Sequence, residues 1–523
     1  MAEAVPLTRR RRATAALLAL LLALPFFVRL AGAPLFDVDE GAFSEATREM
    51  LASGDWLHTT LNGADRFDKP IGVYWLQALA AQVFGLGEFA MRLPCALAAW
   101  AMALAVVAFC RPRFGDRPAW VAGFIVATSF GVQMIGRAAT ADALLNLLIV
   151  LAACDLWRHS QSNAVAPLRR AFFWMALGFL VKGPVAVLVP GAALGVWLLA
   201  SRRWDVLRST LRDPWAWTIF VAVALPWYAY ALHRHGMAFV DGFLLRHNVG
   251  RFGAPMQGHA GSKLYYLVVV PLLALPWSPL LAGVIARARD WWREPLGRFL
   301  LAWSGFVLVF FTLAATKLPH YALYGYAPLA MLMARVFDEA GRKMRLALWI
   351  VLVAWACAAA VLPWFILAPQ GMALVRDPFY RALLSGLAEP AAAAPAIVLI
   401  VLAVLLALAV AKRVASAPLA GALAVSLLIA GWAIPWWGEV LQGPVRRAAQ
   451  AAAAHGARTA GAAQWGTNLP SFAFYLGRPV PLRMPTASEF ALVRADRWPA
   501  DAAARPRIFE ERGIILLGPE PTR

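Results

Sequence analysis

Long apolar runs separated by short polar segments repeat along most of the chain. Each run is close to the roughly 20 residues that a helix needs to cross a membrane. We count about thirteen runs of this length, which predict transmembrane helices beginning near Ala13, Leu93, Trp120, Ala143, Ala171, Pro184, Trp215, Leu264, Phe299, Ala322, Leu346, Ala394 and Pro418. The pattern predicts an all-α polytopic membrane domain over residues 1–437.

Basic residues identify the loops that face the cytoplasm. Every second polar segment is rich in Arg and Lys, as cytoplasmic loops are. These segments contain Arg111, Arg113 and Arg117; Arg158, Arg169 and Arg170; Arg202, Arg203, Arg208 and Arg212; Arg287, Arg289, Arg293 and Arg298; Arg342, Lys343 and Arg345; and Lys412 and Arg413. A cytoplasmic amino terminus and an odd number of spans place the carboxyl terminus on the outer side. A cleaved signal peptide ending at Ala31-Gly32-Ala33 is the alternative for the first run, but the many later spans favour a retained helix.

Composition excludes a purely soluble protein. Of the 523 residues, 61% are apolar and only 15% are charged, whereas about 25% are charged in soluble domains. The net charge of +20 would suggest nucleic acid in a soluble protein. Here the basic residues lie in loops between spans, so we expect membrane lipids, and no nucleic acid, as partners. Cysteines stand in apolar stretches without metal-ligand spacing and are expected to be packing residues: Cys95, Cys110, Cys154 and Cys357.

The first outer segment, residues 34–92, is too long for a simple connection. It opens with Asp37-Val38-Asp39-Glu40, and the following pattern predicts an amphipathic helix that ends at Gly54. A second helix is predicted to begin at Asp68-Lys69-Pro70 and to continue through Phe84. We expect both helices to lie at the outer membrane surface. They would display Asp39, Glu40, Arg66, Asp68 and Lys69 at the membrane edge.

Residues 438–523 differ from the rest of the chain. Their polarity is mixed, and short strand-like runs such as Ile514-Ile515-Leu516-Leu517 occur near the end. They predict a small soluble α/β domain on the outer side of the membrane. This segment contains no motif that indicates a function.

The other outer loops also carry charged and polar residues. They contain Asp142, Lys182, His247, Arg251, His259, Lys317 and Tyr321. Charged groups at the edge of a membrane are costly, and they indicate function. Cations that face a carboxylate at this boundary suit the transfer of a group from a lipid phosphate. The departing phosphate gains charge that the cations stabilise, and the carboxylate can accept a proton from an acceptor hydroxyl.

Five stretches carry a resemblance to a known family. They are Asp39 to Trp56, Phe67-Asp68-Lys69-Pro70-Ile71, and later Lys182-Gly183-Pro184, Arg251-Phe252 and Lys317-Leu318-Pro319-His320-Tyr321, in that order. Together they resemble the bacterial aminoarabinose lipid A transferases and the wider dolichyl-phosphate-mannose mannosyltransferase-like family. The resemblance implies a GT-C fold in the bacterial inner membrane, a polyprenyl-phosphate-sugar donor, inversion at the sugar carbon and a periplasmic active site.

The resemblance also implies roles for individual residues. Asp39 matches the catalytic aspartate, with Glu40 beside it, and Lys69, Arg251 and Tyr321 match ligands of the donor phosphate. Asp68 falls where the aminoarabinose enzymes carry a glutamate that can hold a metal ion, so a divalent metal remains open while no cofactor is expected to be required. This chain has Gly41-Ala42-Phe43 where those enzymes resemble Thr-Arg-Tyr. The loop arginine is therefore missing, and Arg66 is a candidate to replace its charge.

Several alternatives remain at this point. The acceptor can be lipid A, a related envelope glycolipid or a protein hydroxyl. A secondary transporter is a rival from another class, but the charges cluster at outer span ends and no repeat relates the two halves. Single residues also have structural interpretations. Asp39 and Glu40 suit a helix start, Asp68 a helix cap, and Lys182 and Lys317 a membrane boundary. Asp142 suits either an acid or a structural partner. The histidines lack tight spacing, which favours hydrogen bonds over zinc.

Overall fold

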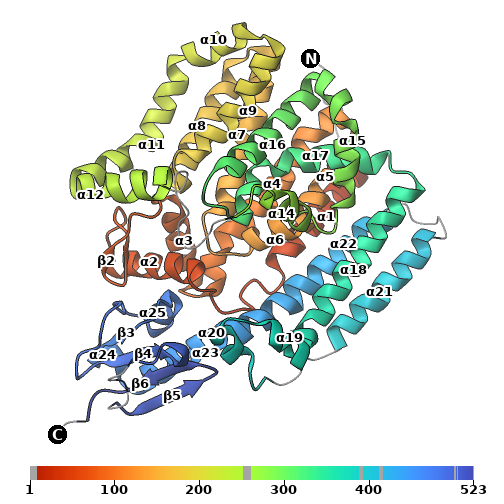
Figure 1. Ribbon diagram of the computed structural model, residues 1–523. Helices are drawn as coiled ribbons and strands as arrows, with labels where there is room; N and C mark the ends of the chain where they lie inside the picture. The colour runs from red at the N-terminus through yellow and green to blue at the C-terminus, as the bar shows by residue number, and fades with distance from the viewer. Residues whose placement is uncertain are drawn as a thin grey trace.

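The computed structural model describes residues 9–250, 261–387, 393–410, 416–499, 502 and 505–521. In these residues the amino-terminal and central parts form a helical bundle, and a small sheet lies near the carboxyl terminus. Figure 1 places the amino terminus and α10 at one end of the molecule, and α2, α25 and the sheet at the other.

The predicted apolar runs all form helices. Each of the predicted starting points lies in, or directly beside, a helix. These helices are α1 (Arg9–Phe27), α4 (Glu88–Phe114), α5 (Asp116–Thr128), α7 (Asp142–Ser162), α8 (Val165–Lys182), α9 (Val185–Ser201), α11 (Pro214–His235), α14 (Tyr265–Leu273), α16 (Pro295–Leu313), η2 (Pro319–Gly325) with α17 (Tyr326–Asp338), α18 (Arg342–Leu367), α21 (Ala393–Val410) and α22 (Ala417–Leu428).

Length and hydropathy qualify fewer of these helices as full membrane spans. Among the described residues, six helices are long and apolar enough to cross a membrane: α4, α7, α11, α16, α18 and the continuous helix over Ala417–Ala454. A seventh is reached if α5 and α6 (Phe130–Gly136), bent by 63°, count as one span. The chain is therefore a polytopic helical membrane protein, while the count of about thirteen spans is not confirmed.

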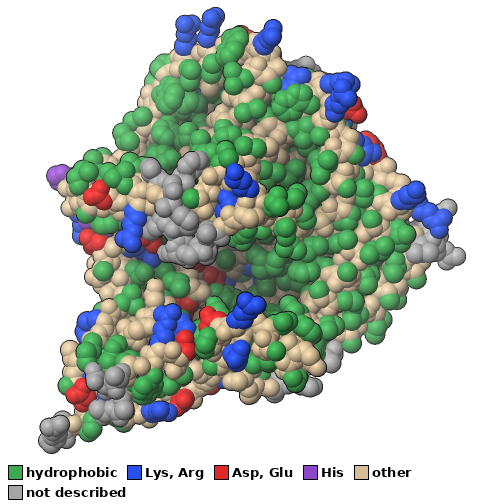
Figure 2. Space-filling view, viewed as in Figure 1, with side chains coloured by type: hydrophobic (Ala, Val, Ile, Leu, Met, Phe, Trp, Pro, Cys, Tyr) green, Lys and Arg blue, Asp and Glu red, His purple; other side chains and the backbone are tan. Residues whose placement is uncertain are grey.

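Shorter helices connect and flank the bundle. They are α10 (Trp204–Arg212), α12 (Met237–Phe239), η1 (Val240–Val249), α15 (Pro279–Arg293), α19 (Pro369–Leu374) and α20 (Pro378–Leu384). Apolar side chains remain exposed on several long helices, including Leu267, Ile350 and Ile400. Figure 2 shows hydrophobic side chains spread over the helical part, with Lys and Arg along its upper edge. This distribution fits a surface that contacts lipid.

The first outer segment forms two helices joined by a hairpin. They are α2 (Asp39–Ser53) and α3 (Gly72–Phe84), and the hairpin pairs β1 (Thr60–Leu61) with β2 (Ala64–Asp65). Gly54 adopts φ 71° and donates its N–H to the Met50 carbonyl, so α2 ends where the sequence predicts. Pro70 lies just before α3 rather than inside its first turn.

The two helices differ in what surrounds them. Exposed Leu79, Val83 and Phe84 give α3 an apolar face, which suits an interfacial helix. The same expectation is wrong for α2, because its polar residues Glu45 and Arg48 are buried as well as its apolar ones. Helix α2 packs between α3 and α25 (Pro470–Leu476). Protein therefore covers both faces of α2. Its charged side chains find partners in that surrounding protein.

Those partners tie α2 to its neighbours. Arg48 forms two hydrogen bonds of 2.7 Å with Glu45, and it donates to the Gly477 carbonyl at 3.2 Å. Thr47 donates to Gln77 of α3 at 2.8 Å. Buried polar groups need such partners because their desolvation is otherwise uncompensated. Helix α2, which carries Asp39 in its first turn, is consequently held by both the bundle and the carboxyl-terminal unit.

The carboxyl-terminal unit contains the expected mixture of helices and strands. Its sheet has the order β3-β4-β6-β5, in which β3 pairs with β4 in parallel and the other pairs are antiparallel. The elements are η3 (Ile429–Ala433), α23 (Ile434–Ala454), α24 (Ala457–Ala460), β3 (Ala462–Gln464), α25, β4 (Phe490–Arg494), η4 (Ala495–Arg497), β5 (Arg507–Glu511) and β6 (Ile514–Leu517). Helix α23 crosses the predicted boundary at Gly438 without a break, so the membrane helix leads directly into this unit.

Candidate active site

Asp39 occupies the first turn of α2, at the amino-terminal end of the helix. Its side chain is exposed. A helix amino terminus favours a negative charge, because the unpaired backbone N–H groups point toward it. The position therefore suits both a structural carboxylate and one that meets a substrate.

Glu40 has a different environment from Asp39. Its Oε1 and Oε2 atoms accept hydrogen bonds from the Arg92 guanidinium at 2.8 and 2.7 Å, and the pair is almost fully buried. The backbone N–H groups of Phe36 and Ala139 also donate to this carboxylate, at 2.9 and 2.7 Å. Both oxygens are thus engaged by the protein. Glu40 thus holds the segment before α2 in place, while Asp39 is exposed, and the predicted catalytic role of the pair stays a prediction.

The turn between β2 and α3 carries three of the predicted residues. Arg66 donates to the Tyr74 hydroxyl at 3.0 Å, and its Nη2 atom lies 3.4 Å from the Asp68 carboxylate. Its guanidinium stands 5.5 Å from the centre of the Phe43 ring. The Lys69 ammonium donates to the Asp68 carbonyl at 3.0 Å. Two cations therefore stand beside the amino-terminal part of α2.

A second charged group forms where α7, α8 and η2 meet. The Lys182 ammonium lies 2.6 Å from Asp142 Oδ1, and the Tyr324 hydroxyl donates to the same oxygen at 3.0 Å. His320 Nε2 is 3.8 Å from it. The buried Tyr321 ring lies 5.8 Å from the Lys182 ammonium. Asp142 is thus the centre of a buried polar network, and Lys182 is not a simple boundary lysine.

His320 links the two charged groups. Burial lowers the pKa of this histidine from 6.5 to about 4, and the charges that act on it are, in order, those of Asp142, Lys182, Asp39 and Lys69. The last two belong to the first outer segment, so both groups face a common space. At neutral pH the imidazole is neutral, because its pKa lies well below 7. A neutral His320 agrees with the predicted hydrogen-bonding role.

The Lys317 side chain binds backbone carbonyls at the end of α16. Its buried ammonium donates to the carbonyls of Thr312 and Ala314, at 2.8 and 2.7 Å. These carbonyls lie at the carboxyl-terminal end of α16, where helix carbonyls lack intrahelical partners and a cation is favourable. Lys317 thus caps α16, and its predicted substrate contact stays a prediction.

Three predicted substrate-binding residues fall largely outside the described structure. Arg251 and His259 lie in residues 251–260, which are not described. The backbone of His247 belongs to η1, but its side chain is not described. Their predicted roles in donor binding stay predictions.

A cavity of about 550 Å³ opens beside Asp39. Its polar end is lined by Asp37, Asp39, Glu40, Arg92 and Arg137. Its apolar wall comes from α6, α18 and the segment around α23, and includes Phe130, Met134, Trp355, Leu362, Ile434 and Trp437. Lys182 and Lys317 do not line it. The cavity therefore has carboxylates and arginines at one end and hydrocarbon along its side.

Asp37 connects this site to the carboxyl-terminal unit. Its Oδ1 accepts from the Ser471 backbone N–H at 2.8 Å, and its Oδ2 accepts from the Ser471 hydroxyl at 2.5 Å. Burial raises the pKa of Asp37 from 3.8 to about 7, while these hydrogen bonds lower it. The contact depends on Gly41, because a Cβ there would lie 2.2 Å from Asp37 Oδ1 and 2.6 Å from the Ser471 nitrogen.

Substituting Gly41→Ala should therefore lower the stability of the protein by about 1–3 kcal/mol, the usual cost of overpacking. The apparent melting temperature in detergent, followed by tryptophan fluorescence, measures this. Gly191→Ala is a matched control, because no atom lies within 4 Å of a Cβ added at this glycine of α9. Equal melting temperatures for the two variants would show that the Asp37–Ser471 contact adapts to the methyl group.

Sequence patterns did not reveal several residues of this site. Arg92 and Ser471 are isolated in the sequence, and each is defined only by a distant carboxylate, Glu40 or Asp37. Tyr324 is different, since it follows Tyr321 by three residues. That spacing puts two side chains on the same side of a 3₁₀ helix, so the local pattern alone contained this signal.

Comparisons with known proteins agree with this arrangement. Residues 68–230 match the family described as dolichyl-phosphate-mannose-protein mannosyltransferase. The undecaprenyl phosphate-α-4-amino-4-deoxy-L-arabinose arabinosyl transferase of Edwardsiella ictaluri is 34% identical over 369 residues, covering 68% of this chain and 65% of that relative. The protein of the same name from Erwinia tasmaniensis is 31% identical over 380 residues, covering 70% and 67%. The chain belongs to this arabinosyl transferase family. The matched part spans about two thirds of these relatives.

The chain shares its fold with a solved protein structure over almost its whole length. The crystal structure of ArnT from Cupriavidus metallidurans bound to undecaprenyl phosphate superposes with a TM-score of 0.81 and covers 97% of this chain and 98% of its own, at 20% identity. This likeness confirms the GT-C-like fold expected from the resemblance. The carboxyl-terminal unit, for which the sequence gives no motif, lies inside the superposed region because so little of either chain is left out.

Proposed function

We propose that this member of the arabinosyl transferase family is an inverting glycosyltransferase of the bacterial inner membrane. It moves a sugar from a polyprenyl-phosphate donor, undecaprenyl phosphate in the names of its relatives, to lipid A or a related envelope glycolipid. The observation that carries the proposal is that the charge of Asp39 acts on Arg66, which stands on the same turn as Lys69. His320 interacts electrostatically with both Asp39 and Lys69, so one carboxylate and several cations converge on one space.

The cations serve the phosphate of the donor. Lys69 and Arg66 stand on the turn before α3, whose exposed apolar face lies next to the membrane. Arg251 and Tyr321 complete the donor site by resemblance. As the bond between the sugar and the phosphate breaks, its electron pair passes to the phosphate oxygen. Fixed cations stabilise that added charge more in the transition state than in the bound donor, which accelerates the step.

Asp39 acts on the acceptor side of the sugar. An acceptor hydroxyl attacks the sugar carbon opposite the departing phosphate, and Asp39 takes up the proton that this hydroxyl releases. The new bond forms on the opposite face from the broken one, which inverts the configuration. The Asp142–Lys182–Tyr324 network keeps His320 and Tyr321 in place, and so contributes by positioning.

Arg66 supplies the charge that the Gly41-Ala42-Phe43 sequence lacks. Its guanidinium lies 5.5 Å from the ring of Phe43, the residue directly after Ala42. Asp39 is among the charges that act on Arg66. This proximity supports the interpretation that Arg66 replaces a guanidinium carried by α2 in the aminoarabinose enzymes. The donor phosphate would then meet the same charge from a different element.

The cavity beside Asp39 suits the hydrocarbon part of a lipid substrate. It joins a carboxylate end to a wall of apolar side chains from α6, α18 and the α23 region. Lipid-linked substrates have this combination of a polar head and an apolar tail. The cavity volume of about 550 Å³ lies within the range of small-molecule sites.

The topology that the proposal requires is supported by ion pairs between basic loops. Arg117 lies 3.3 Å from Asp338, Arg287 lies 3.2 Å from Glu339, and Arg335 lies 2.8 Å from Glu294. Helices α5, α15, α16 and α17 therefore meet at one end of the bundle, and α2 with the carboxyl-terminal unit lies at the other. With a cytoplasmic amino terminus, the first outer segment and the site face the periplasm.

The proposal is tested by giving the purified full chain an undecaprenyl-phosphate-linked aminoarabinose donor together with lipid A in detergent. We expect lipid A to gain the sugar, detected by mass spectrometry, at a rate that scales with protein. Lys69→Ala should weaken both donor binding and turnover, because its charge acts on the phosphate in both states. Lys343→Ala is a matched control, since this exposed lysine lies in the first turn of α18 and does not line the cavity.

A protein hydroxyl is the second candidate acceptor, because residues 68–230 match the protein mannosyltransferase family. Serine- and threonine-containing peptides added to the same assay distinguish the two acceptors. Transfer to the peptide and not to lipid A would overturn the glycolipid assignment and retain the glycosyltransferase. No transfer to either acceptor, from any polyprenyl-phosphate sugar, would overturn the enzyme itself.

A further inference from the structure

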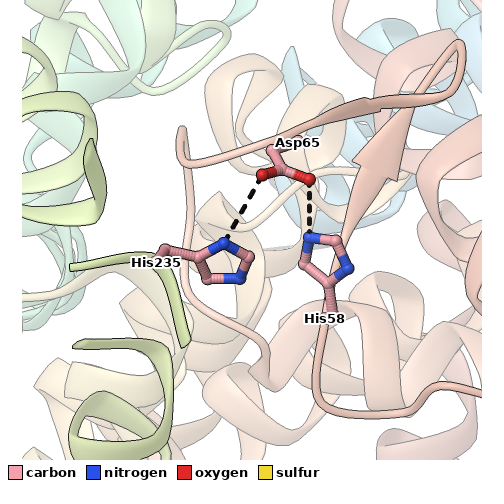
Figure 3. A group of neighbouring side chains, drawn as sticks. All are labelled: His58, Asp65 and His235. Atoms are coloured by element: carbon pink, nitrogen blue, oxygen red, sulfur yellow. Dashed lines mark ion pairs between the residues drawn. The ribbon is translucent and has the colours of Figure 1, made fainter. Parts of the chain in front are cut away.

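Two histidines and an aspartate meet outside the proposed active site, at the end of α11. His58 precedes β1, Asp65 ends β2, and His235 ends α11. His58 Nε2 lies 3.0 Å from Asp65 Oδ1, and His235 Nδ1 lies 3.4 Å from Asp65 Oδ2. Figure 3 shows both imidazole rings directed toward the one carboxylate. Segments that are far apart in the sequence thus present three metal-ligating side chains to one point.

We propose that His58, Asp65 and His235 bind a divalent metal ion of the zinc type and fasten the first outer segment to α11. The three ligand atoms lie within 4.8 Å of one another. Within the described residues, these form the one such group of three or more His, Cys, Asp or Glu side chains. Asp68, the residue for which the resemblance implies a metal, is not among them.

The distances suit a small tetrahedral ion. Zinc binds nitrogen and oxygen ligands at about 2.0–2.1 Å, which separates two tetrahedral ligands by about 3.3 Å. His58 Nε2 lies 3.0 Å from Asp65 Oδ1 and His235 Nδ1 lies 3.4 Å from Asp65 Oδ2, so a rotation of the carboxylate would bring one oxygen to this distance from both nitrogens. Three protein ligands leave a fourth position for water. The site therefore requires only small side-chain adjustments to close around an ion.

The types of ligand indicate which metals fit. Two imidazoles and one carboxylate suit Zn²⁺, Co²⁺, Ni²⁺ or Cu²⁺, whereas Mg²⁺ and Ca²⁺ prefer a shell made only of oxygen. Asp55 adds a further negative charge that acts on both histidines. Arg234 opposes it, but this arginine is paired with Asp55 at 2.6 Å. The local charge thus remains favourable for a cation.

His58 provides an independent observation. Its Nε2 atom is buried and makes no hydrogen bond with any described residue, although Asp65 Oδ1 lies 3.0 Å away. The two atoms are therefore close enough for an ion pair, but their relative orientation does not make a hydrogen bond. A buried polar atom without a hydrogen bond is costly. A metal ion between the nitrogen and the carboxylate would satisfy both groups.

The consequence of binding would be a fixed hairpin. His58 and Asp65 flank β1 and β2, and Arg66 follows Asp65 directly. Phe67 packs on the His235 ring, with the ring centres 5.1 Å apart. A metal that joins the hairpin to α11 would thus restrain the turn that carries Arg66 and Lys69. The metal site itself does not depend on the proposed transferase activity.

The experiment measures metal binding by the full chain in detergent. Protein stripped with a chelator is given Zn²⁺, desalted, and its metal content is determined by mass spectrometry. We expect Asp65→Asn and His58→Ala to lose about one Zn²⁺ per chain relative to wild type, and to weaken Zn²⁺ affinity by at least about 100-fold. Asp65 is half exposed, so Asp65→Asn should fold normally. Co²⁺ should give the intense visible bands of a four-coordinate ion in wild type only.

Two control variants make the result specific. His233→Ala removes an exposed histidine two residues before His235 on the same helix, and Asp68→Asn removes the carboxylate implied by the resemblance. Both should keep the Zn²⁺ that Asp65→Asn loses. Wild type that takes up no Zn²⁺ would overturn the site and would leave only the ion pairs of Asp65 with the two histidines. The same conclusion follows if Zn²⁺ is lost in Asp68→Asn but kept in Asp65→Asn.

Discussion

Replacing Asp39 by asparagine should reduce turnover by about 10²–10⁴-fold while leaving the fold and donor binding intact. The amide has nearly the same size as the carboxylate, so the first turn of α2 should be undisturbed. It cannot accept a proton from an acceptor hydroxyl, which is the step assigned to Asp39. Steady-state turnover and donor affinity of purified wild type and variant measure the two parts separately.

The acceptor used in that assay decides what the result means. An acceptor that is already an ionised phosphate needs no base, and Asp39 would then orient the donor sugar instead. The variant must therefore be compared on hydroxyl and phosphate acceptors. Asp205→Asn is a suitable control, because this exposed carboxylate pairs with Arg203 and does not line the cavity. Turnover near the wild-type rate on both acceptors would remove Asp39 from the mechanism.

Replacing Arg92 by leucine should lower the stability of the protein by about 3–5 kcal/mol, because it leaves the buried Glu40 carboxylate without its cation. Arg92 also donates to the carbonyls of Leu30, Ala33 and Pro34, at 3.1, 2.7 and 2.9 Å. The loop that leads to Asp39 thus loses several contacts at once. The apparent melting temperature in detergent reports the loss.

Two further variants test the electrostatic cause of that loss. Arg117→Leu breaks an exposed pair with Asp338 and should have little effect, since surface pairs contribute about 0–1 kcal/mol. The double variant Arg92→Leu with Glu40→Gln should be more stable than Arg92→Leu alone, because no unpaired charge remains buried. If the double variant is no more stable, lost packing rather than the buried charge explains the effect.

Helix positions were predictable because their signals are local. Each apolar run could be recognised from its own residues, and each formed a helix. Gly54 ends α2 as expected, because its left-handed backbone conformation is set within one turn. The covering of both faces of α2 was not predictable. Its amphipathic pattern resembles that of a helix lying on lipid, and only the docking of α3 and α25 gives its polar residues partners in the protein.

The roles of the charged residues could be predicted only in part. The sequence indicated that Lys182 and Asp142 matter, but 40 residues separate them and no local pattern pairs them. Lys317 looked the same as Lys182 in the sequence. In the structure one lysine joins a buried carboxylate and the other caps α16. A lysine's role follows from its nearest partner, which depends on how the helices pack.

The amino-acid sequence by itself determined that this chain is a helical membrane protein with a charged first outer segment and an aspartate at the start of its helix. Hydropathy, helix capping and motif order act over short distances along the chain, so they can be recognised without the fold. Tertiary structure alone decided that Glu40 belongs to Arg92, that Asp37 belongs to Ser471 and that His58, Asp65 and His235 meet. These pairings join residues up to 434 positions apart. Packing brings them together, and the cost of burying an unpaired polar group selects the partner.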